Sequence, residues 1–88
     1  MNFGILTECY VRAGKDHTQA FDDAFEQVAA AEAAGLDSVW VVEQHFRPWA
    51  SVLPSPMVMA SAIAARTSRM RVGLAVQVLP LNNPLRIA

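Results

Sequence analysis

Apolar and polar positions along the chain change their spacing several times, and each change predicts a new element. Residues 3–6 form a short apolar run that ends in a polar segment, which is typical of a buried strand followed by a long loop. Apolar side chains then recur at helical spacing, so we predict a helix over residues 18–34 with acidic side chains in its first turns. Gly35 ends this helix, because glycine reaches positive φ freely, and Leu36 supplies the apolar contact behind it.

Two further apolar runs predict strands. Residues 38–42 are mostly β-branched or aromatic and show no polar alternation, which is the pattern of a strand covered on both faces, as in a parallel sheet. Residues 72–78 form a third apolar run of the same kind. We therefore expect both segments to be buried strands.

A second helix is predicted over residues 57–67, between these two strands. Ser55 and the proline after it mark its start, since serine caps free N–H groups and the φ of proline suits the first helical position. Arg66 and Arg69 lie near its end, where positive charge complements the helix dipole.

The elements alternate strictly between strand and helix. Asn83 and the proline after it repeat the helix start, so a third helix opens over residues 85–88. This order is the α/β pattern of parallel strands joined by right-handed crossovers. The first strand-to-helix connection has no glycine triplet, which weakens a dinucleotide-binding interpretation. Polar residues gather after each strand, where parallel α/β folds place their chemistry.

The composition is too apolar for a chain of this length. Of the 88 residues 53% are hydrophobic and 17% are charged, against roughly 45–50% and about 25% in a typical domain. Three explanations stay open: an apolar dimer face, insertion into a membrane, or a part of something larger. The longest uncharged stretch, residues 48–65, holds three prolines and is a poor membrane span, so we expect no membrane association.

Cysteine and charge exclude several classes of protein. The single cysteine, Cys9, allows no disulfide framework, so we expect it to be a buried or half-buried thiol. Cysteine and histidine residues show no zinc-ligand spacing, so we expect no metal site. The first residues lack the features of a signal peptide, which favours the cytoplasm. All eight acids precede residue 44 and five of the seven bases follow it, but those bases are sparse, so we expect no nucleic-acid binding.

The segment after residues 38–42 is the richest in candidate chemistry. His45 lies three residues beyond this strand, beside Glu43 and Gln44, and aromatic residues follow it. Histidine exchanges a proton near neutral pH, and aromatic neighbours offer a flat apolar wall to a planar ligand. Two interpretations stay open: His45 takes part in catalysis, or it merely hydrogen-bonds a loop carbonyl.

These residues resemble the bacterial-luciferase-like flavin monooxygenases and their deazaflavin-dependent relatives. The resemblance covers all 88 residues and is carried by several segments: Phe3-Gly4, residues 33–40, Glu43-Gln44-His45-Phe46, Arg71-Val72-Gly73, Val78-Leu79-Pro80 and residues 83–88. It implies an α/β fold of the TIM-type (β/α)8 barrel class. Residues 1–88 are then the N-terminal fragment of a single barrel domain: its first three βα units, truncated after the start of the third helix.

The resemblance also implies roles for the segment around His45. His45 matches the second histidine of the luciferase segment and the proton-handling histidine of the deazaflavin enzymes. Gln44 stands where luciferase has the histidine tied to its chemistry, so that assignment does not transfer. We expect His45 near the redox ring, with Gln44 donating or accepting a hydrogen bond, and we assign both as catalytic.

Cofactor and substrate contacts are assigned on the same grounds. Family members commonly have a non-proline cis peptide after strand three that supports the ring, and the matching bond is Ala75–Val76, with an ordinary trans bond as the alternative. We assign Ala75, Val76 and Glu43 to cofactor binding. Thr7, Glu8 and Trp49 are assigned to the substrate side, with a solvated loop as the alternative for Thr7 and Glu8.

The function implied is oxidation of a small organic substrate by oxygen and reduced FMN. A flavin reductase would supply the reduced cofactor, the full-length enzyme would be a homo-oligomer, and the 88-residue chain alone would be inactive. One alternative is hydride transfer with a deazaflavin cofactor. Another is a non-catalytic truncated fragment or interaction module.

Overall fold

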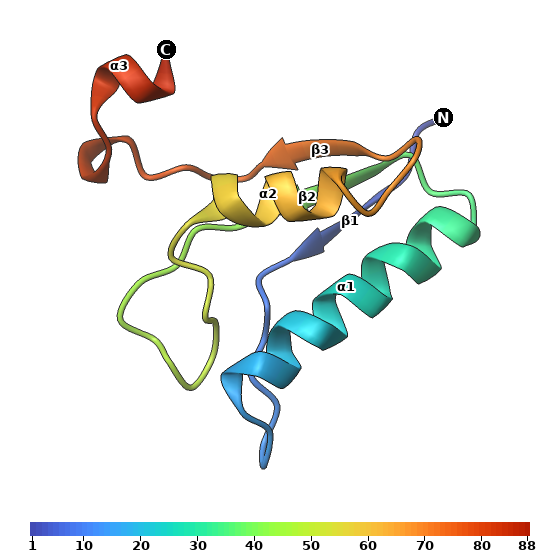
Figure 1. The fold of residues 1–88 in the computed structure, drawn as a ribbon, viewed down its shortest axis with the longest axis horizontal. Coiled ribbons are helices and arrows are strands. Elements are labelled where there is room, and N and C mark those ends of the chain that lie inside the picture. The colour runs from blue at the N-terminus through green and yellow to red at the C-terminus, as the bar shows by residue number, and fades with distance from the viewer.

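Three short strands lie side by side in a parallel sheet in the computed structural model, which describes residues 1–88 (Figure 1). The strands are β1 (Gly4–Thr7), β2 (Ser38–Val41) and β3 (Arg71–Leu74), in that order across the sheet. The helical segments are α1 (His17–Ala33), α2 (Pro56–Ala64), the 3₁₀ turn η1 (Leu79–Leu81) and α3 (Pro84–Ile87). The alternation of strand and helix and the parallel pairing are confirmed.

Helices α1 and α2 cover one face of the sheet, and the other face is open. Val39 and Val41 of β2 are fully buried in a cluster with Val28 of α1 and Ile63 of α2. Trp40 between them is 45% exposed, and Leu6 of β1, its register partner, is 60% exposed. The expectation that these strands are covered on both faces is therefore wrong for this chain, because no element packs on the second face.

The open face has a row of three residues at the same level of the sheet, and the third, Gly73 of β3, has no side chain. Leu6 pairs with Trp40, and Trp40 pairs with Gly73. A Cβ atom added at Gly73 would overlap the indole ring of Trp40, so the ring lies directly over the glycine. This row shows that an apolar surface continues across the sheet on the side away from the helices.

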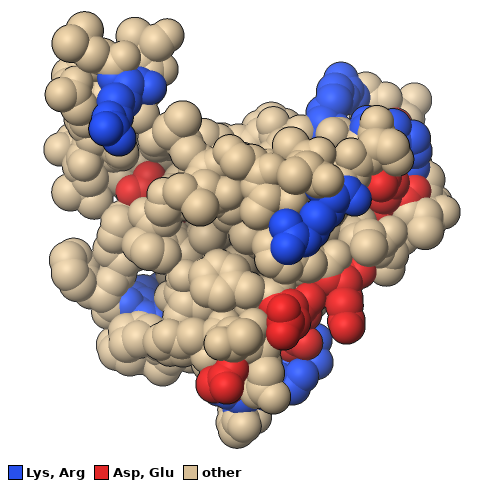
Figure 2. Space-filling view, viewed as in Figure 1, with Lys and Arg blue, Asp and Glu red and all other residues tan.

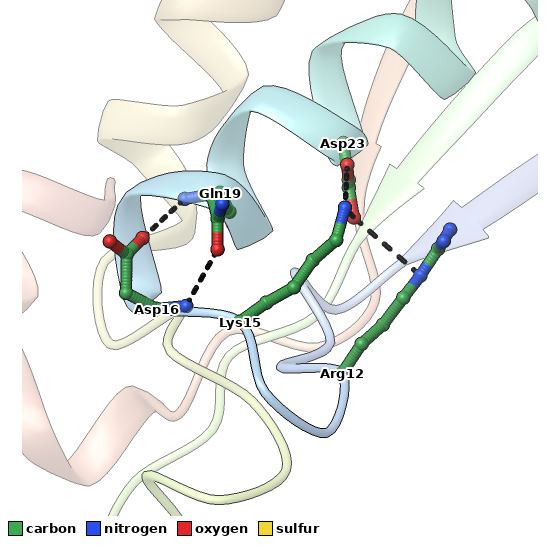
Figure 3. Close-up of polar contacts among 5 residues, drawn as sticks. All are labelled: Arg12, Lys15, Asp16, Gln19 and Asp23. Carbon is green, nitrogen blue, oxygen red and sulfur yellow. Dashed lines mark hydrogen bonds and ion pairs between the residues drawn. The ribbon is translucent and has the colours of Figure 1, made fainter.

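Helix α1 begins with a capping box (Figure 3). The Asp16 carboxylate accepts from the Gln19 backbone N–H, and the Gln19 side chain accepts from the Asp16 N–H, both at 2.9 Å. The acidic side chains expected in the first turns begin in the second helical turn, with Asp22 and Asp23. Asp23 pairs with Arg12 at 3.5 Å and Lys15 at 3.3 Å. Figure 2 shows acidic side chains gathered along α1, with basic ones beside them.

The end of α1 is tied to the turn before β3. Gly35 follows the helix at a φ of +91°, as predicted for its end. One Glu32 oxygen accepts from the backbone N–H groups of Ser68, Arg69 and Met70, at 2.9, 2.8 and 3.2 Å. The Arg69 guanidinium donates to the carbonyls of Glu32 and Leu36. Arg69 therefore stabilises the end of α1 and not, as expected, the end of α2.

The second helix starts at Pro56 and ends three residues before the predicted limit of residues 57–67. Ser55 makes no side-chain capping hydrogen bond, so the predicted cap is wrong, although the proline does occupy the first turn. Arg66 donates to the carbonyl of Ala62 at the helix end, as expected. At α3 the Asn83 side chain does accept from the Leu85 N–H, at 2.9 Å.

The third strand ends at Leu74, four residues before the predicted limit of residues 72–78. Its neighbour β2 ends at Val41, so the pairing stops after the Ala75 N–H donates to the Val41 carbonyl at 2.8 Å. The chain beyond then bonds to the loop after β2, where the Val76 carbonyl accepts from the Glu43 N–H. No helix in the structure combines the length and apolarity needed to cross a membrane.

Replacing Glu32 by glutamine is expected to lower stability in a pH-dependent way. The hydrogen bond from the Arg69 backbone N–H is the main cause that lowers the pKa of Glu32 below its usual 4.5. Partial burial acts to raise this pKa, while the Ser68 and Met70 N–H bonds and the positive charge of Arg69 lower it further. The stabilisation is therefore present above about pH 4.5 and lost as pH falls through the lower folded value. Urea unfolding of Glu32→Gln should show a lower midpoint than wild type at pH 7, and the gap should narrow as the pH falls below about 4.5.

Glu26 provides the matched control for this prediction. It lies on the same helix, is exposed, and its side chain makes no hydrogen bond or ion pair. Glu26→Gln should leave the midpoint nearly unchanged at both pH values. Equal effects of the two substitutions would contradict the role assigned to Glu32.

Candidate functional site

The candidate site lies where the carboxyl ends of the three parallel strands meet. Glu8 follows β1, the segment from Glu43 to His45 follows β2, and residues 75–78 follow β3. Because all strands run in the same direction, these segments emerge at one edge of the sheet. The structure thereby brings together polar groups that are more than thirty residues apart in the sequence.

Gln44 links the segment after β2 to the segment after β1. Its amide nitrogen donates to the Glu8 carboxylate at 2.9 Å, and its backbone N–H donates to the Leu53 carbonyl. The Gln44 side-chain oxygen is buried and has no hydrogen-bond partner. Buried polar atoms are nearly always paired, so this oxygen marks a place where a donor is missing.

Glu43 links the same segment to the chain after β3. One carboxylate oxygen lies 2.7 Å from His45 Nε2, and the other accepts from the Val78 N–H at 2.7 Å. Burial alone would raise the pKa of Glu43, but the His45 hydrogen bond, the Val78 N–H and the charge of a protonated His45 together lower it below its usual value. Glu43 is therefore an ionised, buried carboxylate held on both sides.

The loop after His45 is aromatic and exposed. Phe46 has a φ of +59° and is 94% exposed, and Trp49 is 70% exposed. Gln44, His45 and Phe46 line an open concavity of about 420 Å³ together with residues of the same loop and His17. Trp49 is not among the lining residues, so the structure does not bring it to this concavity.

The loops after β1 and β2 are held to each other by an antiparallel contact that the sequence did not predict. Tyr10 and Ser51 form a β-bridge, and the Val11 N–H donates to the Ala50 carbonyl at 3.0 Å. The Ser51 hydroxyl, which is buried, donates to the Glu8 carbonyl. No periodic signal marks these residues, because a single bridge between two loops leaves no repeat in either of them.

Thr7 and Cys9 lie on the helix side of this edge. Thr7 is the last residue of β1 and is 5% exposed, and its hydroxyl accepts from the Cys9 N–H at 3.5 Å. Cys9 is buried, as expected, and burial raises the pKa of its thiol to about 11, with the Thr7 bond opposing. The structure therefore places Glu8, but not Thr7, beside Gln44. The Ala75–Val76 peptide bond, left open as cis or trans, is cis.

The sequence model of one protein family, described as luciferase-like monooxygenase, matches residues 1–88. The chain belongs to the luciferase-like monooxygenase family. Its resemblance to this family is thereby confirmed.

Relatives of this luciferase-like chain include a monooxygenase and an F420-dependent dehydrogenase. The chain is 30% identical to the alkanal monooxygenase alpha chain of the Kryptophanaron alfredi symbiont over 98% of its own length and 24% of that protein. It is 45% identical to the F420-dependent glucose-6-phosphate dehydrogenase of Kineococcus radiotolerans, over 66% of its length and 18% of that protein. The chain thus spans about a quarter or less of the length of these relatives.

A solved structure shares the fold of this luciferase-like chain. It is the oxygenating constituent of 3,6-diketocamphane monooxygenase from Pseudomonas putida, in complex with FMN. The TM-score is 0.86 at 25% identity, over 99% of this chain and 24% of that one. The α/β fold with a parallel sheet is therefore shared with a family member that binds FMN.

The luciferase-like chain carries no cluster suited to a metal. No group of three or more histidine, cysteine, aspartate or glutamate side chains lies close enough together to hold an ion. The polar groups at the sheet edge instead pair with one another and with backbone groups. Proton exchange and hydrogen bonding are the chemistry that this arrangement offers.

Ser51→Ala is expected to loosen the contact between the two loops. The buried hydroxyl is lost and the Glu8 carbonyl loses its donor, which should lower the free energy of unfolding by about 1 kcal/mol. Ser61→Ala is the matched control, since that exposed hydroxyl bonds only within α2 and alanine favours a helix. Urea unfolding measures the free energy of unfolding of both variants. If Ser51→Ala lowers it no more than Ser61→Ala does, Ser51 does not hold the two loops together.

Proposed function

We propose that this chain is part of a flavin-dependent oxidoreductase, a luciferase-like monooxygenase that oxidises a small organic substrate. The observation that carries the proposal is the buried Gln44 oxygen without a partner, on a residue that lines the same concavity as His45. A flavin ring system has N–H donors along one edge, which are the groups that such an acceptor lacks. Family membership and the FMN-bound structural relative support the same conclusion.

The residues at the sheet edge suit a planar, hydrogen-bonding cofactor. Gln44 would accept a hydrogen bond from the ring while Glu8 holds its amide group, and His45 would hold or release a proton beside the ring. Ala75 and Val76 would lie against it, and Phe46 would exclude water. When bound, the flavin supplies the electrons and the site of oxygen activation, whereas the protein supplies orientation.

The open face of the sheet supports a larger architecture. We propose that residues 1–88 form the first three βα units of a (β/α)8 barrel, whose interior would cover Leu6 and Trp40. The two outer strands β1 and β3 each leave one edge unpaired, which further strands would fill. In this arrangement the edge with Glu8, Gln44 and His45 is the barrel mouth, where such enzymes place their active sites.

Three further features of the whole protein belong to this proposal. A reductase would supply the reduced flavin, the active protein would be a homo-oligomer, and it would work in the cytoplasm. The 88-residue chain by itself would be inactive, because most of the barrel would be absent. These features rest on membership of the family.

A deazaflavin cofactor is the second candidate. It is favoured by the 45% identity to an F420-dependent dehydrogenase, which exceeds the identity to the alkanal monooxygenase. In this case the reaction would be hydride transfer without oxygen, and His45 would donate or accept the accompanying proton. The two candidates differ in the need for oxygen, which a turnover experiment measures directly.

The active protein is expected to purify with bound flavin and to require oxygen. His45→Asn should lower kcat by roughly 10²- to 10⁴-fold, the range for loss of a general acid or base. Glu26→Gln is the control, because Glu26 is exposed on α1, makes no side-chain hydrogen bond or ion pair, and should leave kcat unchanged. A deazaflavin absorption spectrum, or turnover without oxygen, would overturn the monooxygenase proposal in favour of hydride transfer.

The 88-residue chain alone is expected to bind FMN negligibly. Barrels of this class commonly hold the phosphate group after strands seven and eight, which three βα units do not include. Fluorescence titration of the purified chain with FMN should therefore show no saturation in the micromolar range. Micromolar binding would show that the phosphate is anchored within residues 1–88.

A further inference from the structure

Contacts within the protein occupy both oxygens of the Glu43 carboxylate. Its side chain is 3% exposed, and each of its oxygens has a close hydrogen-bond partner, His45 Nε2 on one side and the Val78 N–H on the other. Its own backbone N–H donates to the Val76 carbonyl. A side chain so enclosed has no free surface with which to contact a bound cofactor.

These contacts determine where the protons lie. A backbone N–H can only donate, and an ionised carboxylate can only accept. The pKa of Glu43 is lowered, so the carboxylate is ionised near neutral pH. The hydrogen bond to His45 therefore requires a proton on Nε2 of the imidazole.

The other imidazole nitrogen is left available. His45 Nδ1 has no hydrogen-bond partner in the protein, and it is not among the buried atoms without a partner. The His45 side chain is 26% exposed and borders the open concavity. In the neutral imidazole, Nδ1 then carries the lone pair on the side that a ligand can reach.

We propose that Glu43 is a positioning residue, which holds His45 with its proton on Nε2 and presents Nδ1 as the atom that exchanges a proton with the ligand. The same carboxylate holds the segment after β3 through Val78, so His45 and the Ala75–Val76 bond keep a common position. The part that concerns proton exchange rests on the proposed function. The part that concerns the imidazole and the two hydrogen bonds does not.

Only a carboxylate satisfies both partners while the imidazole proton stays on Nε2. A glutamine at position 43 has one acceptor oxygen and one donor nitrogen, so it would either lose one of the two bonds or donate to Nε2 and force the imidazole proton onto Nδ1. Val78 offers a cleaner change, because its φ of −79° is close to that of proline. Val78→Pro removes the backbone donor and keeps the carboxylate, and Val78→Ala keeps the donor and serves as its control.

Nitrogen-detected NMR of the full chain tests the proposal without any cofactor. Neutral His45 should show a hydrogen-bonded proton on Nε2 that is protected from solvent exchange, and exposed His17 provides the internal reference. Glu43→Gln should lower this protection by at least tenfold or remove the signal, while the dispersion of the backbone spectrum reports whether the variant is folded. An unprotected Nε2 proton in wild type, or a proton on Nδ1, would overturn the proposal.

The Val78 variants test the second half of the link. Val78→Pro should shift the Ala75 and Val76 resonances and leave the protected His45 Nε2 proton in place, whereas Val78→Ala should change neither. Unchanged Ala75 and Val76 resonances in Val78→Pro would show that the carboxylate does not hold this segment. This result is readable even if Glu43→Gln fails to fold.

Measurements of kcat and of the Kd for FMN on the active protein distinguish a positioning role of Glu43 from a role in cofactor binding. Glu43→Gln should lower kcat at least tenfold while the Kd for FMN changes less than about twofold. A large rise in Kd with unchanged kcat would make Glu43 a cofactor contact and overturn the proposal. If no flavin binds to any form, the proposed function fails, but the NMR result still decides the role of Glu43.

Discussion

The parallel pairing of β2 with both of its neighbours is the constraint on which the rest of the structure depends. Ile5, Val39 and Val72 share one level of the sheet, so all three strands begin and end together. The segments that follow them must therefore leave from the same edge. An antiparallel neighbour would have carried Glu8 or Val78 to the opposite edge, and the contacts around Gln44 and Glu43 would not form.

Beyond the last paired residues of the strands, side-chain hydrogen bonds connect the segments that follow β1, β2 and β3. Gln44 reaches the segment after β1 through Glu8, and Glu43 reaches the segment after β3 through Val78. Burying a carboxylate is costly unless its oxygens are paired, and both Glu43 oxygens are. The site is thus rigid where Glu43 holds it and incomplete where the Gln44 oxygen has no partner.

Much of the fold was predictable because local patterns decide it. The helical spacing of Ala24, Val28 and Ala31 predicted α1 to within one residue at each end, and these side chains do form its buried face. The position of His45 beyond a buried strand predicted the candidate site. The length of β3 was not predictable, because an apolar run records burial, whereas a strand also requires a partner, and β2 stops at Val41.

The sequence by itself determined the order of the elements, the end of α1 at Gly35 and the residue types that gather after each strand. Only the tertiary structure decided that Glu43 joins His45 to Val78, that Gln44 donates to Glu8, and that one face of the sheet stays open. The physical reason is the range of the interactions. Helix periodicity and glycine φ preferences act over a few residues, whereas these contacts join groups that only the register of the sheet brings together.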